Sequence, residues 1–183
     1  RVERTVYRFG GIKLPDGKTP TAAAVPAGNE FLLVTVWDVA QRKGQLAVIA
    51  VKGPVPATFD YMPHEQRPCF WGLPNWPGVK QMKLLGFVDL PFAAPLAISL
   101  GQDHVSGNGR GNSDNIGLDL NSQAQRDVWY NWSGSQYKRT ARSGYALVSS
   151  RAENQVAFID LQPLFQYYRT MCLTTQANYD QTK

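Results

Sequence analysis

The chain has 183 residues, enough for one domain with a substantial core, and carries a formal net charge of +5 with its Lys and Arg residues scattered. No stretch approaches the ~20 apolar residues of a membrane-spanning helix, so no membrane span is predicted. The two cysteines, Cys69 and Cys172, form no CxxC pattern, which excludes a zinc knuckle and a covalently attached c-type haem.

The first part of the chain contains four apolar segments. Residues 11–15 and 20–25 are short and strand-like, and each is bordered by proline. Proline is tolerated where a strand begins or ends, because no ladder hydrogen bond is lost there. Residues 31–35 and 45–51 are two apolar strands joined by a polar turn, which predicts a β-hairpin. We therefore predict a four-stranded unit over about residues 7–52.

A proline-rich insertion follows at about residues 53–79. Its prolines reduce the entropy lost when an irregular segment becomes ordered. Its large aromatic residues supply apolar contact area: they are Phe59, Tyr61, Phe70, Trp71 and Trp76. Two interpretations stay open and are compatible. The insertion is a docking surface for a partner chain, a Pro-rich ligand or a carbohydrate, or it is a plug that covers a bare sheet edge.

A second unit, over about residues 82–162, repeats the order of the first. Residues 86–91 and 95–100 precede a hairpin formed by residues 145–149 and 155–161. Self-similarity of this kind is typical of repeat architectures.

The insertion within the second unit, about residues 101–143, begins with a segment rich in Gly, Asn, Asp and Ser. Oxygen-bearing side chains at short spacing can bind Ca²⁺. The candidate ligands are Asp103, Asn108, Asn112, Asp114 and Asp119. Their spacing is not that of an EF-hand, and the same residue types favour turns for conformational reasons. A turn-rich loop is therefore the preferred interpretation, with calcium as the alternative.

The later part of this insertion interleaves aromatic and basic residues, namely Trp129, Trp132, Lys138, Arg139 and Arg142. Aromatic and Arg side chains dominate the hot spots of protein interfaces, and they also stack on nucleic-acid bases. We interpret them as loop residues that pack on the sheet or as a protein interface, and nucleic acid is disfavoured because no nucleic-acid motif is present.

The C-terminal part, residues 163–183, contains the helix predicted in the chain. Pro163 suits a first helical turn, and apolar residues recur at helical spacing up to Met171. Cys172 follows this pattern. Two separate buried thiols are the more economical interpretation of the cysteines, and a disulfide is the alternative if the chain is exported.

The order of segments in the two units resembles the blades of YVTN-type (NHL/WD-like) β-propellers. In such blades an aromatic residue opens an apolar strand, a polar turn with Asn follows, and the second strand ends in Ile-Asp. Tyr145, Asn154 and Asp160 stand at these positions, whereas the first hairpin has Ala50 in place of Asp160. The resemblance implies a mainly β fold, a partial β-propeller of about two four-stranded blades with long insertions and one short C-terminal helix.

Two blades do not close a ring, since propellers have about four to eight. The resemblance therefore implies that residues 1–183 form one partial propeller domain whose partners are other protein chains or the remaining blades. A self-contained sandwich of two sheets, with two similar hairpins, is the alternative architecture.

We expect a non-enzymatic interaction or scaffold module in a larger exported assembly, periplasmic or extracellular. The alternative is a fragment of a propeller enzyme, hydrolase or lactonase-like, with its site in the insertions or in other blades. The two histidines, His64 and His104, lie one in each insertion, and no spacing of HExxH, GxSxG or P-loop type accompanies them.

Overall fold

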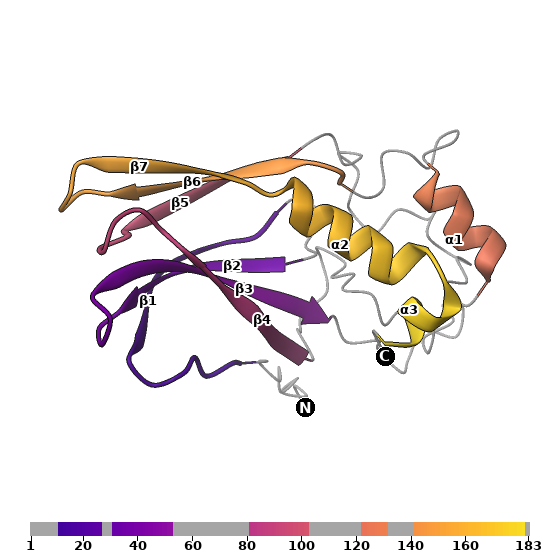
Figure 1. The fold of residues 1–183 in the computed structure, drawn as a ribbon, viewed down its shortest axis with the longest axis horizontal. Helices are drawn as coiled ribbons and strands as arrows, with labels where there is room; N and C mark the ends of the chain where they lie inside the picture. The colour runs from indigo at the N-terminus through magenta and orange to yellow at the C-terminus, as the bar shows by residue number, and fades with distance from the viewer. Residues whose placement is uncertain (1–10, 27–30, 53–80, 103–121, 132–140, 182–183) are drawn as a thin grey trace, which may run out of the picture.

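The computed structural model describes residues 11–26, 31–52, 81–102, 122–131 and 141–181. Within these residues the fold is mainly β, with two antiparallel sheets and three helices. Figure 1 shows the sheets as two layers, with the helices at the end of the molecule opposite the hairpin turns.

The first sheet, called sheet A, contains β1 (Lys18–Ala24), β2 (Phe31–Asp38), β3 (Lys43–Lys52) and β4 (Gln81–Asp89), paired in that order. The central strands β2 and β3 are nearly continuous apolar runs, because apolar side chains are buried on both faces of the sheet. β1 bulges at Thr21, whose hydroxyl lies 2.8 Å from that of Thr35.

The second sheet, called sheet B, contains β5 (Ala97–Gln102), β6 (Gly144–Ser150) and β7 (Gln155–Asp160), also paired in chain order. Alternate residues of β6 are buried, and in β7 the buried Ala157 and the half-buried Ile159 alternate with exposed residues, as expected for strands with one face on a core. Both sheets are therefore antiparallel meanders.

Both predicted hairpins are confirmed. β2 pairs with β3, and β6 pairs with β7. The turns at residues 39–42 and 151–154 both end on a residue with positive φ, at Arg42 (51°) and Asn154 (54°). Asn adopts this left-handed conformation more readily than Arg does.

Residues 86–91, predicted at the start of the second unit, are placed differently in the structure. Residues 86–89 lie in β4, which pairs with β3 in sheet A, with Leu46 opposite Val88 and Gln45 opposite Asp89. A repeated Leu-Pro pair marks the end of a strand, but it does not say which neighbour that strand joins. Residues 11–15, which we predict as the first strand of the first unit, lie outside any strand in the structure, and β4 is the fourth strand of sheet A instead. Sheet B has three strands among the described residues.

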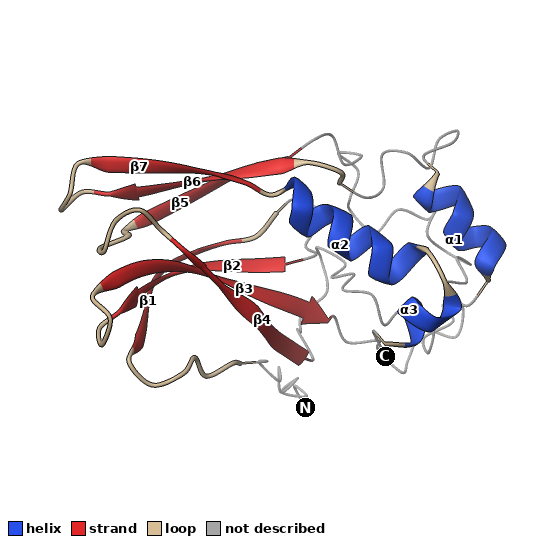
Figure 2. Ribbon diagram, viewed as in Figure 1, coloured by secondary structure: helices blue, strands red, loops and turns tan. Residues whose placement is uncertain are grey.

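Three helices lie at one end of the sheets: α1 (Gln123–Tyr130), α2 (Gln162–Leu173) and α3 (Gln176–Asp180) (Figure 2). α2 confirms the predicted C-terminal helix, with Pro163 in its first turn. α1 and α3 were not predicted, since both are too short to show a clear apolar period. Among the described helices, none is long and apolar enough to cross a membrane.

The two sheets pack on each other around one core, which α2 closes at its end. Phe31 of β2 is fully buried there, and its ring lies 6.3 Å from that of Phe165 and 6.0 Å from that of Tyr168, both on α2. Edge-to-face rings at such distances add to the energy of apolar burial. The described residues show two packed sheets, and they do not show a ring of blades.

Cys172 lies fully buried on α2 and is disulfide-bonded. No described cysteine is free, so the prediction of separate thiols is wrong for Cys172. Sequence spacing could not show this, because disulfide formation depends on distance in space. Cys69 lies outside the described residues.

Candidate interaction surface

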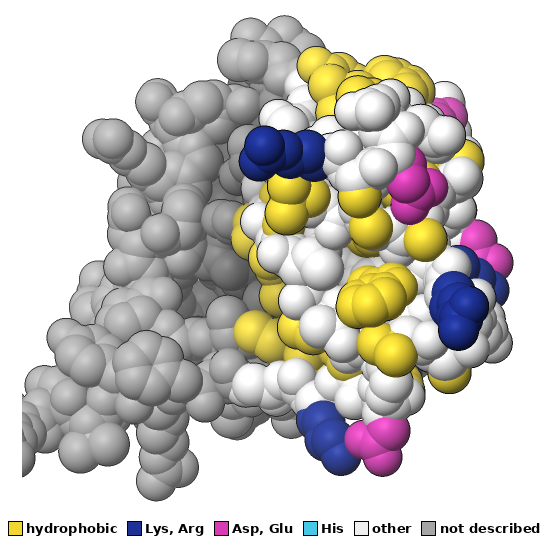
Figure 3. Space-filling view, turned by 90° about the vertical axis from the view of Figure 1, so that its left-hand side faces the viewer, with side chains coloured by type: hydrophobic (Ala, Val, Ile, Leu, Met, Phe, Trp, Pro, Cys, Tyr) yellow, Lys and Arg dark blue, Asp and Glu magenta, His cyan; other side chains and the backbone are white. Residues whose placement is uncertain are grey.

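The outer face of sheet B, which points away from sheet A, carries exposed apolar side chains. The exposed fractions are 42% for Tyr145 and 39% for Leu147 on β6, and 68% for Val156 and 67% for Phe158 on β7. We call these four residues the outer patch. In Figure 3, hydrophobic side chains gather at the top, the side on which sheet B lies in Figure 1. Contiguous exposed apolar residues of this kind mark interaction sites.

Cross-strand pairing holds the outer patch in a fixed shape. Leu147 stands directly opposite Phe158 in the register of β6 and β7. The Tyr145 ring stacks on Phe158 with a centroid distance of 5.3 Å and an interplanar angle of 22°. The same ring covers Gly101 of β5, where an added Cβ would overlap it. The surface is therefore preorganised, which lowers the entropy lost on binding.

The repeat identifies the residues of the first hairpin that correspond to the outer patch. Aligned copy on copy, the equivalents of Tyr145, Leu147, Val156 and Phe158 are Phe31, Leu33, Leu46 and Val48. The first three of these equivalents are fully buried in the core between the sheets, and Val48 is partly buried and packs against it. The same positions are thus covered in sheet A and bare in sheet B.

The other face of each hairpin also has different neighbours in the two sheets. In sheet A, a second apolar cluster contains Val34, Val36, Ala47 and Ile49, and Ile12 and Leu14 pack on it. The equivalent positions of sheet B are Val148, Ser150, Ala157 and Ile159, which face the shared core or lie buried beside it. The two sheets therefore meet through opposite faces of the repeat. Such a contact is head-to-tail, and it can be repeated by a further sheet.

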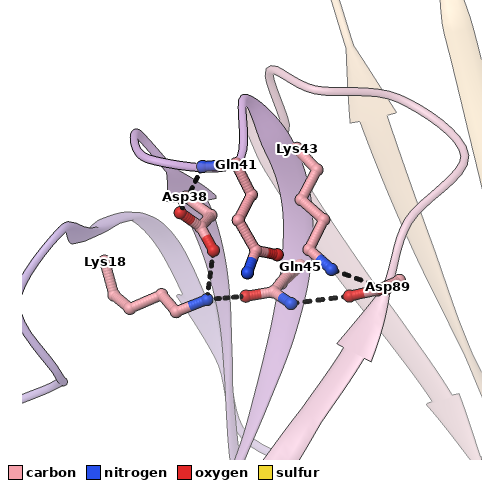
Figure 4. Close-up of polar contacts among 6 residues, drawn as sticks. All are labelled: Lys18, Asp38, Gln41, Lys43, Gln45 and Asp89. Carbon is pink, nitrogen blue, oxygen red and sulfur yellow. Dashed lines mark hydrogen bonds and ion pairs between the residues drawn. The ribbon is translucent and has the colours of Figure 1, made fainter.

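A ladder of polar side chains crosses all four strands of sheet A near the hairpin turn (Figure 4). Lys18 contacts Asp38 and Gln45, and the Gln45 amide donates to Asp89 Oδ1 at 2.6 Å. Lys43 Nζ lies 2.8 Å from Asp89 Oδ2. Two cations balance two carboxylates, so the ladder stabilises strand pairing and leaves no group poised for acid–base chemistry.

The ladder lowers the pKa values of its two carboxyl groups. For Asp38 the main cause is the hydrogen bond from Lys18, followed by the Gln41 amide, which lies 3.0 Å from Oδ1. For Asp89 the main cause of the lowered pKa is the hydrogen bond from Gln45, followed by that from Lys43.

These lowered pKa values predict an acid-dependent stability. A depressed folded-state pKa stabilises the fold fully above the unfolded pKa of about 3.9, and the contribution is lost as pH falls through the folded pKa. We expect the urea midpoint to fall between pH 5 and pH 2, and to fall less in the double variant Asp38→Asn with Asp89→Asn. An equal fall of the urea midpoint in the natural chain and in the double variant would contradict a stabilising role for these two carboxylates.

Two buried arginines join the helices. Arg126 of α1 donates to Gln123 Oε1 at 2.7 Å and to Gln176 Oε1 at 2.9 Å, and its guanidinium lies over the Tyr179 ring. Arg169 of α2 donates to the Tyr130 carbonyl oxygen. The Arg126 contacts join α1 to α3, and the Arg169 contact joins α2 to α1. Sequence analysis missed both arginines, because a single Arg among polar residues gives no sign of burial.

A shallow cleft of about 440 Å³ lies between the turn of β6–β7 and the loop before β5. It is lined by Ala94, Pro95, Leu96, Arg151 and Ala152. Glu153 fixes this loop by accepting hydrogen bonds from the Ala93 and Ala94 amides at 2.8 and 3.0 Å. With one charged residue and otherwise apolar walls, the cleft lacks the convergent polar groups of a specific ligand site.

Most of the sequence-predicted site residues lie outside the described residues. These are Phe59, Tyr61, Phe70, Trp71, Trp76, Trp132, Lys138 and Arg139 of the interface set, both histidines, and the calcium candidates Asp103, Asn108, Asn112, Asp114 and Asp119. Of the others, Trp129 belongs to α1, and Arg142 is exposed just before β6. Across the described part of the chain, no group of three or more His, Cys, Asp or Glu side chains could hold a metal ion.

The outer patch was not among the predicted interface residues. Both faces of each hairpin are apolar in the sequence, and no local pattern separates a covered face from a bare one. Comparison with protein-family models, with curated proteins and with solved structures gives no match for this chain. The geometry of the two sheets is therefore the basis for assigning a function.

Proposed function

We propose that this chain is a non-enzymatic interaction module that joins a larger β-sheet assembly through the outer patch. The observation that carries the proposal is the contrast between the two copies of the hairpin. Phe31 is fully buried in the core that the two sheets share with α2, whereas Tyr145, at the equivalent position, is 42% exposed. Burial of apolar surface stabilises association in proportion to the area removed from water, so covering the exposed parts of these four side chains favours association.

The arrangement supports consecutive blades of a β-propeller as the finer description. Sheet A is a four-stranded antiparallel meander, and sheet B follows in the same sense. The first strands of the two sheets, β1 and β5, contact each other, as the inner strands of neighbouring blades do. Head-to-tail packing is also the relation that a closed ring requires. In this proposal the outer patch faces the next blade.

The disulfide at Cys172 supports an exported assembly, periplasmic or extracellular. Disulfides persist in oxidising compartments and are rare in the reducing cytosol.

Hydroxyl-radical footprinting tests the proposal on the particle purified from its natural source. We expect the Tyr145 and Phe158 rings to be oxidised several-fold more slowly in that particle than in the isolated chain, because another sheet covers them. Tyr167 of α2 is the matched control, since it is an exposed aromatic residue outside the outer patch. Equal oxidation of Tyr145 and Phe158 in both samples would refute the docking role of this face.

A further inference from the structure

The outer edge of β7 lacks a neighbour among the described strands. Sheet A runs β1-β2-β3-β4, whereas sheet B ends at β7, the equivalent of β3. Open edges are normally protected by proline, Lys or bulges. β1 has Pro20 and a bulge, and the pairing of β4 is also bulged. β7 has neither proline nor Lys, and its register with β6 is continuous. This edge resembles a pairing surface.

The backbone direction of β7 can be read from one hydrogen bond. The Leu161 amide donates to the Gly144 carbonyl oxygen at 2.8 Å, towards β6. Backbone groups alternate in direction along an antiparallel strand, so the N–H and C=O groups of Val156 and Phe158 point to the open edge.

The equivalent strand β3 uses the same set of positions to hold β4. The Gly44 amide donates to the Phe92 carbonyl oxygen, and the Leu90 amide donates to the Gly44 carbonyl oxygen, both at 2.9 Å. By alternation, the backbone groups of Leu46 and Val48 also face β4. In the repeat these two residues correspond to Val156 and Phe158.

Gln45 of β3, which contacts Asp89 at the end of β4, has a counterpart in β7, namely Gln155. The Gln45 amide donates to the Asp89 carboxylate at 2.6 Å. Its equivalent, Gln155, opens β7 and is exposed. A Gln amide can donate to a carboxylate on an incoming strand, and a hydrogen bond to a charged group is stronger than one between neutral groups.

We propose that β7 receives a fourth strand from a partner segment outside this chain, an apolar strand of the β4 type whose carboxylate is held by Gln155. This inference rests on the proposed interaction role and adds a second contact to it. A second copy of the chain does not donate its β4, because the β4 of each copy is already paired with its own β3. Strand addition of this kind derives affinity from main-chain bonds and specificity from side chains.

The probe is a synthetic peptide with the sequence of residues 81–91, titrated into the full chain. We expect slower hydrogen exchange at the Val156 and Phe158 amides. The Leu46 and Val48 amides report whether β4 stays in place, and their protection should not change. In β4 the Val88 amide faces the partner strand and the Phe87 amide faces away, by alternation from Leu90.

Two N-methylated peptides therefore form a matched pair. Methylation at Val88 should weaken binding about tenfold or more, while methylation at Phe87 should leave it within about twofold.

An Asp89→Ala peptide should bind about tenfold more weakly to the natural chain than the unchanged peptide does. In the Gln155→Ala chain the two peptides should bind equally. Absence of added protection at millimolar peptide, or equal weakening by both methyl groups, would overturn the proposal.

The outcomes separate the two proposals. Footprint protection of Tyr145 and Phe158 in the native particle, with unprotected Val156 and Phe158 amides in that particle, would keep the docking face and reject the added strand. Protection of the amides without protection of the rings would keep the strand and reject the face.

Discussion

We expect the replacement of Phe31 by alanine to lower the free energy of unfolding by about 3–5 kcal/mol, the usual cost of removing a fully buried Phe from a core. The reason lies in its surroundings, since the ring meets Phe165 and Tyr168 where sheet A joins α2. Truncation would leave a cavity that both sheets and the helix surround. Urea denaturation followed by circular dichroism measures the change.

The matched control is Tyr145→Ala, at the equivalent position of the second hairpin. Tyr145 is 42% exposed and contacts Phe158 and Gly101. We expect a loss of about 1 kcal/mol or less in the isolated chain, as for most surface substitutions. Similar losses for the two variants would mean that the two copies are equally buried, and the contrast on which the proposed function depends would disappear.

Breaking the disulfide at Cys172 is expected to lower the free energy of unfolding by about 2–5 kcal/mol. The bond restricts the unfolded chain, and Cys172 is also fully buried in the core shared by the sheets and α2. Unfolding curves with and without reductant measure the effect.

The variant Cys172→Ala distinguishes the stabilisation that the disulfide provides from the stabilisation that burial of the Cys172 side chain provides. Without reductant it should resemble the reduced natural chain to within about 1 kcal/mol, and reductant should not affect it further. A natural chain that is equally stable with and without reductant would contradict a stabilising disulfide and would remove the support for an oxidising compartment.

Local patterns were sufficient to predict the elements that local forces determine. The β2–β3 and β6–β7 hairpins follow from two apolar strands around a polar turn, and α2 follows from Pro163 and the helical spacing after it. The mainly β class follows from the same patterns. The place of β4 did not, because its pairing depends on the Gln45 and Lys43 contacts to Asp89, which come from a distant strand.

The candidate surface shows a different limit. The sequence alone determined that the chain repeats a hairpin, that each hairpin is apolar on both faces, and that no catalytic spacing accompanies it. Only the tertiary structure decided that Phe31 is covered while Tyr145 and Phe158 remain bare. The physical reason is that the burial of a sheet face depends on what packs against it, and the sequence of a hairpin does not specify that neighbour. Two copies of one pattern therefore look the same in the sequence even when one is buried and the other is exposed.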